Sequence, residues 1–288
     1  MYRHRGTQSL RFDTDLAVFW GFLGAVLLVA LWIWRGSRRR RLADTALLSG
    51  QLTTDERRVL ERVAPLCRFL TVPQRTRWEG AVRLFLARKT FIPCQGSRVD
   101  NDVRLSIAGQ ACLLLAGRPD LEVYPELTTI YLHPGSYVRR DDRSIGGGAI
   151  ATDEEATFDG ESWDHGAVVL SVRSVRASFR FLDGFNVVMH EFAHQLDAMA
   201  GGSDGCPPMP ARLLPGWKVA LDEHHRALGE ADDRGEDPFL DPYGAESPVE
   251  FFAVAVESFF ELGPQFESEH PKFYGMLREV FGLDPARW

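Results

Sequence analysis

The stretch FNVVMHEFAHQLDA occupies residues 185–198 and contains the motif on which the predicted fold and function depend. Its apolar residues recur at helical spacing, which predicts a helix over about 184–200. His190 and His194 are four residues apart, so both imidazoles leave the same face of that helix. With Glu191 they form the pattern His-Glu-x-x-His, in which the histidines bind zinc and the glutamate accepts a proton from water. The alternative is a half-exposed helix whose polar face carries these residues by chance.

A catalytic zinc ion needs a third protein ligand, and the residues just after the motif do not supply it. Metzincins continue with Gly and His at the positions that Asp197 and Ala200 occupy here, which excludes that class. Asp197 can either orient one of the histidines or simply end the helix. The third ligand must therefore come from a more distant part of the chain.

Residues 241–261, DPYGAESPVEFFAVAVESFFE, contain the best candidate for that ligand. Glu250 begins a predicted amphipathic helix over about 248–261. The same glutamate also completes a capping box with Ser247, so its carboxylate can instead bond the backbone of Ser247. Spacing alone gives Glu250 the same weight as three other carboxylates together: Glu257, Glu246 and Asp204.

The remaining pattern predicts an α+β domain that is mostly helical. Asp183 or Gly184 can cap the motif helix. Residues 139–165 contain a glycine triplet and many charges, which indicates a mobile surface loop. Further helices are expected at 54–69, 73–89, 103–115, 215–229 and 271–281, and strands at 129–132 and 167–172. The second strand can offer an edge to an extended peptide.

Residues 16–34, LAVFWGFLGAVLLVALWIW, form an uncharged apolar run that predicts one transmembrane helix. The expected organisation is a tail at 1–15, this helix, a basic juxtamembrane linker at 35–50 and a zinc metallopeptidase domain at 51–288. Five arginines follow the run, and the positive-inside rule then predicts that the catalytic domain faces the cytoplasm. The expected location is a bacterial inner membrane.

The charge distribution argues against nucleic acid as a partner. Eight of the 33 basic residues and two of the 40 acidic residues lie within 1–41, so the rest of the chain carries a net charge of −13. An acidic domain is a poor match for a phosphate backbone. The four cysteines form no Cys-x-x-Cys pair, which disfavours a zinc ribbon, and we expect them to be mostly buried free thiols.

The combination of HEFAHQLD with DPY-x6-EFFAV resembles the Mlc titration factor A family of zinc peptidases. The resemblance extends over most of 55–285 and includes the segments VRLFLARKTF, QACLLL and GAVVLSV. It implies a gluzincin-like zinc metallopeptidase fold with aminopeptidase activity and one zinc ion per chain. By the resemblance, His190, His194 and Glu250 are the metal ligands, Glu191 is the catalytic glutamate and Tyr243 stabilises the oxyanion.

The sequence therefore predicts a zinc-dependent peptidase, aminopeptidase-like, that acts on a peptide or protein substrate. The alternative is a membrane-tethered, non-catalytic zinc module that binds a regulatory protein. Retention of Glu191 argues against that alternative, because a purely structural zinc ion does not need a general base. The family's link to a glucose-uptake repressor is not carried over, since no residue supports it.

Overall fold

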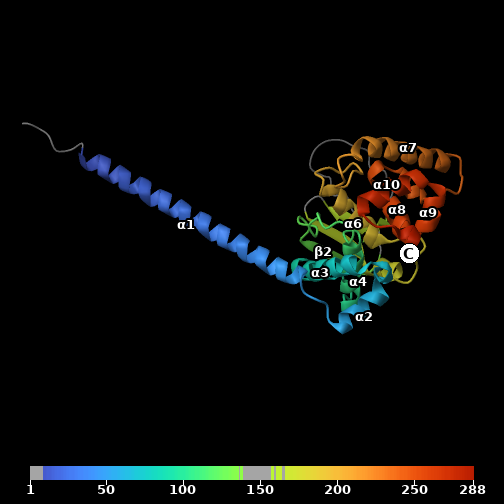
Figure 1. Cartoon of the computed structure of the whole chain (residues 1–288), viewed down its shortest axis with the longest axis horizontal. Helices are drawn as coiled ribbons and strands as arrows, with labels where there is room; N and C mark the ends of the chain where they lie inside the picture. The colour runs from blue at the N-terminus through green and yellow to red at the C-terminus, as the bar shows by residue number, and fades with distance from the viewer. Residues whose placement is uncertain (1–8, 136, 139–156, 159, 164–165) are drawn as a thin grey trace, which may run out of the picture. The chain divides into compact units, whose positions relative to one another are not determined.

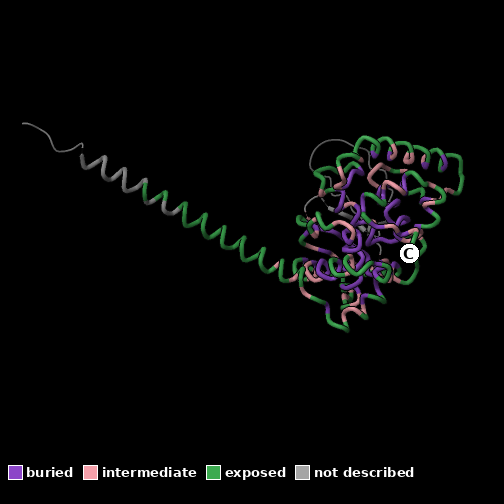
Figure 2. Tube along the Cα trace, viewed as in Figure 1, coloured by how far each residue is buried: buried purple, intermediate pink, exposed green. Residues whose placement is uncertain are grey.

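The computed structural model describes residues 9–135, 137–138, 157–158, 160–163 and 166–288 (Figure 1). The chain forms two compact units, residues 1–49 and residues 50–288. Buried residues are concentrated in the second unit, whereas the described part of the first unit is almost entirely exposed (Figure 2). Most of the predicted mobile loop at 139–165 lies outside the described residues.

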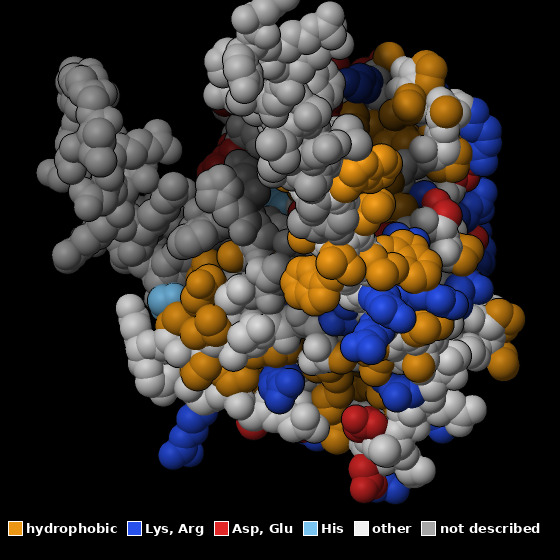
Figure 3. Space-filling model, turned by 90° about the vertical axis from the view of Figure 1, so that its left-hand side faces the viewer, with side chains coloured by type: hydrophobic (Ala, Val, Ile, Leu, Met, Phe, Trp, Pro, Cys, Tyr) orange, Lys and Arg blue, Asp and Glu red, His pale blue; other side chains and the backbone are white. Residues whose placement is uncertain are grey.

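The first unit contains one long helix, α1 (Ser9–Leu48), which continues through most of the stretch expected to be a linker. Its described apolar side chains are exposed, Trp32 by 77%. Figure 3, which draws one face of the whole chain, shows hydrophobic side chains next to Lys and Arg side chains.

The predicted membrane anchor is not borne out. In the described part of the chain, no helix combines the length and the apolarity that crossing a membrane requires. Helix α1 runs directly from the apolar stretch into Arg35 and a run of four arginines at 38–41. The expected transmembrane helix at 16–34 and the inner-membrane location with a cytoplasm-facing domain are therefore corrected, and no membrane segment in the described chain supports the membrane as a partner.

The second unit contains a four-stranded sheet in the order β1-β2-β6-β5. Three strands run parallel, and the outer strand β5 pairs antiparallel with β6. Their bounds are β1 (Thr90–Pro93), β2 (Thr129–His133), β6 (Ala167–Ser171) and β5 (Gly160–Trp163). Strand β6 is buried at every position because it lies between two neighbours and under helices. Two further short strands, β3 (Tyr137–Val138) and β4 (Thr157–Phe158), form a separate pair.

This topology corrects the expectation that the strand at 167–172 offers a free edge. Both edges of β6 are hydrogen-bonded, to β2 and to β5. The outer position belongs to β5, within the stretch that we expected to be a loop. Its four residues, Gly-Glu-Ser-Trp, carry little apolar signal, as is common for an edge strand.

Helices that precede strand β2 in the chain build one half of the core. Trp78 is buried, and its indole N–H donates to the carbonyl of Gly109 at 2.8 Å, which ties two helices together. Buried Lys89 donates from Nζ to the carbonyl of Leu127 at 2.7 Å and so anchors the chain just before β2. The elements are α2 (Thr54–Val63), the 3-10 helix η1 (Pro65–Phe69), α3 (Val72–Arg88) and α4 (Asn101–Leu113).

Helices after the sheet build the other half, and α6 joins the two. Helix α6 contacts β5, β6, α4 and α5 as well as α8. The elements are α5 (Val172–Ser178), α6 (Val187–Ala198), α7 (Leu214–Asp233), the 3-10 helix η2 (Pro242–Ala245), α8 (Pro248–Glu261), α9 (Gly263–Glu269), α10 (Pro271–Phe281) and the 3-10 helix η3 (Pro285–Arg287). The mostly helical α+β prediction is confirmed, although β1, α5 and α9 were not expected.

Candidate metal centre

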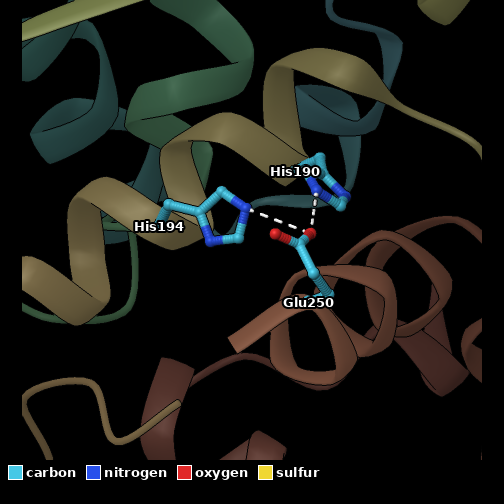
Figure 4. A group of neighbouring side chains, drawn as sticks. All are labelled: His190, His194 and Glu250. Atoms are coloured by element: carbon cyan, nitrogen blue, oxygen red, sulfur yellow. Dashed lines mark hydrogen bonds and ion pairs between the residues drawn. The ribbon is translucent and has the colours of Figure 1, made fainter. Parts of the chain in front are cut away.

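Helix α6 presents the two motif histidines from one face. Its N-cap is Asn186, whose side-chain oxygen accepts from the backbone N–H of Met189 at 3.1 Å. The helix therefore begins later than the expected caps at Asp183 and Gly184. One helical turn separates His190 from His194, and Figure 4 shows both imidazoles directed toward the same carboxylate.

That carboxylate belongs to Glu250, in the first turn of α8. Ser247 caps this helix by accepting from the backbone N–H of Glu250 at 3.2 Å. The Glu250 side chain turns toward α6 instead of closing the capping box. Its Oε2 lies 2.9 Å from Nε2 of His190 and 3.4 Å from Nε2 of His194 (Figure 4).

The three side chains can hold a metal ion. Their ligand atoms all lie within 4.8 Å of one another, and no other such group occurs among the residues described. Their side chains are largely buried, with exposures of 12%, 14% and 22% for His190, His194 and Glu250. Two imidazole nitrogens and one carboxylate form the donor set of a catalytic zinc site, in which the fourth position stays open.

Glu191 lies beside this group with an unused oxygen. The residue is buried, and its Oε2 has no hydrogen-bond partner. Burial raises the pKa of Glu191 to about 7, and the neighbouring charges of His190 and His194 only partly offset that effect. An unpartnered buried carboxyl whose pKa is near neutrality is suited to accept and return a proton.

Glu250 has the opposite electrostatic behaviour. Burial raises its pKa, but hydrogen bonds from His190 and His194 outweigh burial, so the pKa lies well below its usual range. Glu250 is therefore ionised at neutral pH, as a metal-binding carboxylate must be.

Glu257 contacts the other nitrogen of His190. Its Oε1 lies 2.8 Å from Nδ1 of the imidazole, and the residue is 2% exposed. The sequence suggested Glu257 only as an alternative third ligand. A usable signal was present, because Glu250 and Glu257 are seven residues apart and so share one face of a helix.

Tyr243 borders the centre from the 3-10 helix η2. Asp241 caps η2 by accepting from the backbone N–H of Tyr243 at 2.8 Å. Gly244 lets η2 pack closely on α8, since a Cβ there would lie 3.3 Å from Cα of Phe251. The Tyr243 ring centroid is 5.8 Å from that of His190, and the side chain is 39% exposed.

The other acidic candidates lie apart from the histidines. Asp204 is exposed and forms an ion pair with Lys218 at 3.3 Å. Glu246 does not belong to the metal-binding group but raises the pKa of Tyr243 together with Glu250, after the larger effect of burial. Asp197 accepts from the backbone N–H of Gly205 at 2.9 Å, which fixes the loop after α6.

Comparisons with known proteins find similarity over most of the chain. The sequence model of one family, described as glucose-regulated metallo-peptidase M90, matches residues 34–282. An uncharacterized protein from Synechocystis is 36% identical over 222 residues, which cover 75% of this chain and 79% of that protein. Mlc titration factor A from Escherichia fergusonii is 31% identical and from Yersinia pestis 30% identical, covering 77% and 78% of this chain and 83% and 84% of those proteins.

The raised pKa of Glu191 generates a stability prediction for the metal-free protein. Its carboxyl holds a proton more tightly when folded than when unfolded, so its contribution to stability is lost as pH rises from about 4.5 to about 7. Glu191→Gln removes that loss. The free energy of unfolding in urea and chelator should be higher in the variant at pH 8, by up to about 3 kcal/mol, and the difference should vanish near pH 4.5. A difference that is the same at both pH values would contradict this account.

Proposed function

This chain belongs to the M90 family of glucose-regulated metallopeptidases, and on that basis we propose that it hydrolyses peptide bonds with one zinc ion. One observation carries the proposal: the Glu191 carboxyl, whose Oε2 has no hydrogen-bond partner, interacts electrostatically with all three converging ligands, His190, His194 and Glu250. A metal site without a proton acceptor can serve structure alone, whereas this arrangement provides for both binding and proton transfer.

His190, His194 and Glu250 would hold the zinc ion through Nε2, Nε2 and a carboxylate oxygen. When bound there, zinc supplies Lewis acidity, which polarises the scissile carbonyl group and makes a water molecule acidic near neutral pH. The three side chains come from two helices that pack against each other, so the ligands are placed by the fold before the ion binds.

Glu191 would be the general base. Its free oxygen accepts a proton from the attacking water molecule, and the same carboxyl then donates that proton to the leaving amine. A pKa of about 7 lets Glu191 carry out both transfers near neutral pH. Burial excludes bulk water from its carboxyl group, which keeps the transferred proton within the site.

Tyr243 would stabilise the oxyanion. Burial is the largest cause that raises the pKa of its hydroxyl, followed by the negative charges of Glu250 and Glu246. The hydroxyl therefore stays protonated and remains a hydrogen-bond donor throughout the physiological range. Its position beside the His190 ring places it at the rim of the metal centre.

We propose an aminopeptidase-like mode of action from the charge around that rim. Glu246 is exposed and adds negative charge beside Tyr243, which complements the positive charge of a free substrate α-amino group. Strand β5 contacts α6 and is an outer strand of the sheet, with no further strand paired to it among the described residues, so an extended peptide can pair with it.

Metal content and hydrolysis together test the proposal. The full-length chain should contain about one zinc per chain and cleave peptides that have a free α-amine faster than their acetylated counterparts. Glu191→Gln should keep the zinc and lose at least about a hundredfold in kcat. Folded wild type without zinc would refute the metal assignment. Zinc without hydrolysis of any peptide would instead favour the non-catalytic module.

Tyr243→Phe tests the oxyanion role separately. The substitution removes only the hydroxyl, so the zinc content should stay unchanged. Since one oxyanion donor contributes about a hundredfold to a thousandfold, kcat should fall by that factor while KM changes little. An unchanged kcat would show that Tyr243 is a packing residue.

A further inference from the structure

Helix α8 holds the His190 imidazole at both of its nitrogens. Glu250 lies 2.9 Å from Nε2, and Glu257 lies 2.8 Å from Nδ1. The two glutamates are seven residues apart, so two helical turns bring both to the face of α8 that packs on α6. The two nitrogens point out of different edges of the ring, so the glutamates do not compete for the same position.

Both oxygens of Glu257 are occupied. Oε1 faces Nδ1 of His190, and Oε2 accepts from the backbone N–H of Asn186, the N-cap of α6. The residue is nearly inaccessible to water, so these contacts help to offset the cost of burying a carboxylate. Glu257 thus fixes both the ring of His190 and the start of the helix that carries it.

A second layer of polar groups holds this arrangement in place. The side-chain N–H₂ of Asn186 donates to Oε1 of Glu261 at 2.7 Å and to Oε1 of Gln110 at 2.6 Å. Glu261 also accepts from the backbone N–H of Gly184 at 3.1 Å. Glu261 therefore resembles Glu257 in its two acceptor roles, but it is only partly buried, and no hydrogen bond among the described residues joins it to the imidazole.

We propose that Glu257 is a positioning residue that fixes His190 in the tautomer that can bind the metal. The inference rests on the proposed zinc site. In the metal-free protein each nitrogen faces a carboxylate and so carries a hydrogen. Glu257 keeps the hydrogen on Nδ1, so the hydrogen that a metal would replace is the one on Nε2, on the side of Glu250 and His194. The negative charge behind the ring also makes Nε2 a stronger donor to a cation.

Glu257→Gln tests this geometry because an amide has only one acceptor oxygen. The backbone N–H of Asn186 is a donor in every state, so it competes with His190 for that oxygen. If the oxygen pairs with Asn186, the amide N–H₂ faces Nδ1 and favours the tautomer with its hydrogen on Nε2. That tautomer has no lone pair to offer the metal. The variant should therefore bind zinc more weakly although its shape is conserved.

The experiment measures zinc dissociation constants by chelator competition, and urea unfolding without metal, in the full-length chain. Glu257→Gln should weaken zinc binding by about tenfold to a hundredfold. The matched control is Glu261→Gln, one turn further along α8, where an amide likewise replaces a carboxylate that accepts two hydrogen bonds. It should change zinc affinity by less than about threefold even where its loss of stability is as large.

A second measurement on the wild type does not depend on any variant folding. Long-range ¹H–¹⁵N correlation spectra of the zinc-loaded chain should show the hydrogen of His190 on Nδ1. A hydrogen on Nε2, or equal zinc affinity in wild type and Glu257→Gln, would overturn the positioning role and leave the peptidase proposal intact. Wild type that binds no zinc would overturn both.

Discussion

The candidate centre depends on the contacts that the His190 imidazole makes with two glutamates of α8. Through its two nitrogens the imidazole joins α6 to both Glu250 and Glu257 of α8. Helix α8 is buried from Phe251 to Phe260, so it cannot shift without disturbing the core. The placement of the proposed ligands is therefore a consequence of core packing rather than of a mobile loop.

Electrostatics explain why such a centre favours a cation. Glu191, Glu250 and Glu257 bring three carboxyl groups to one region, and the pKa of Glu191 and of Glu257 is raised by burial. Burying carboxylates near one another is unfavourable without positive charge. A divalent cation relieves that cost. Burial, with a smaller effect of the neighbouring carboxylates, places the pKa of Glu191 near neutrality, where a general base works best. In the metal-free protein the raised pKa of Glu191 thus lowers the stability of the fold at neutral and higher pH, although the same pKa suits proton transfer.

The sequence predicted the parts of this protein that are encoded locally. The helices around His190 and Glu250 have clear periodicity, and the structure brings these two residues together with His194. Contacts between residues that are far apart in the sequence were harder to predict. The pairing of His190 with Glu257 spans 67 residues, and strand β5 is short and polar because it lies at a sheet edge. The anchor expected at 16–34 was inferred from the length and apolarity of that run, but no helix in the described part of the chain is long and apolar enough to cross a membrane.

Anomalous X-ray diffraction at the zinc absorption edge, on crystals of the chain purified without chelator, tests the central claim most directly. The account predicts one peak, about 2.0–2.2 Å from Nε2 of His190, Nε2 of His194 and a carboxylate oxygen of Glu250, with Glu257 on the far side of the His190 ring. A zinc peak bound elsewhere, or none between α6 and α8 when zinc is supplied, would contradict it.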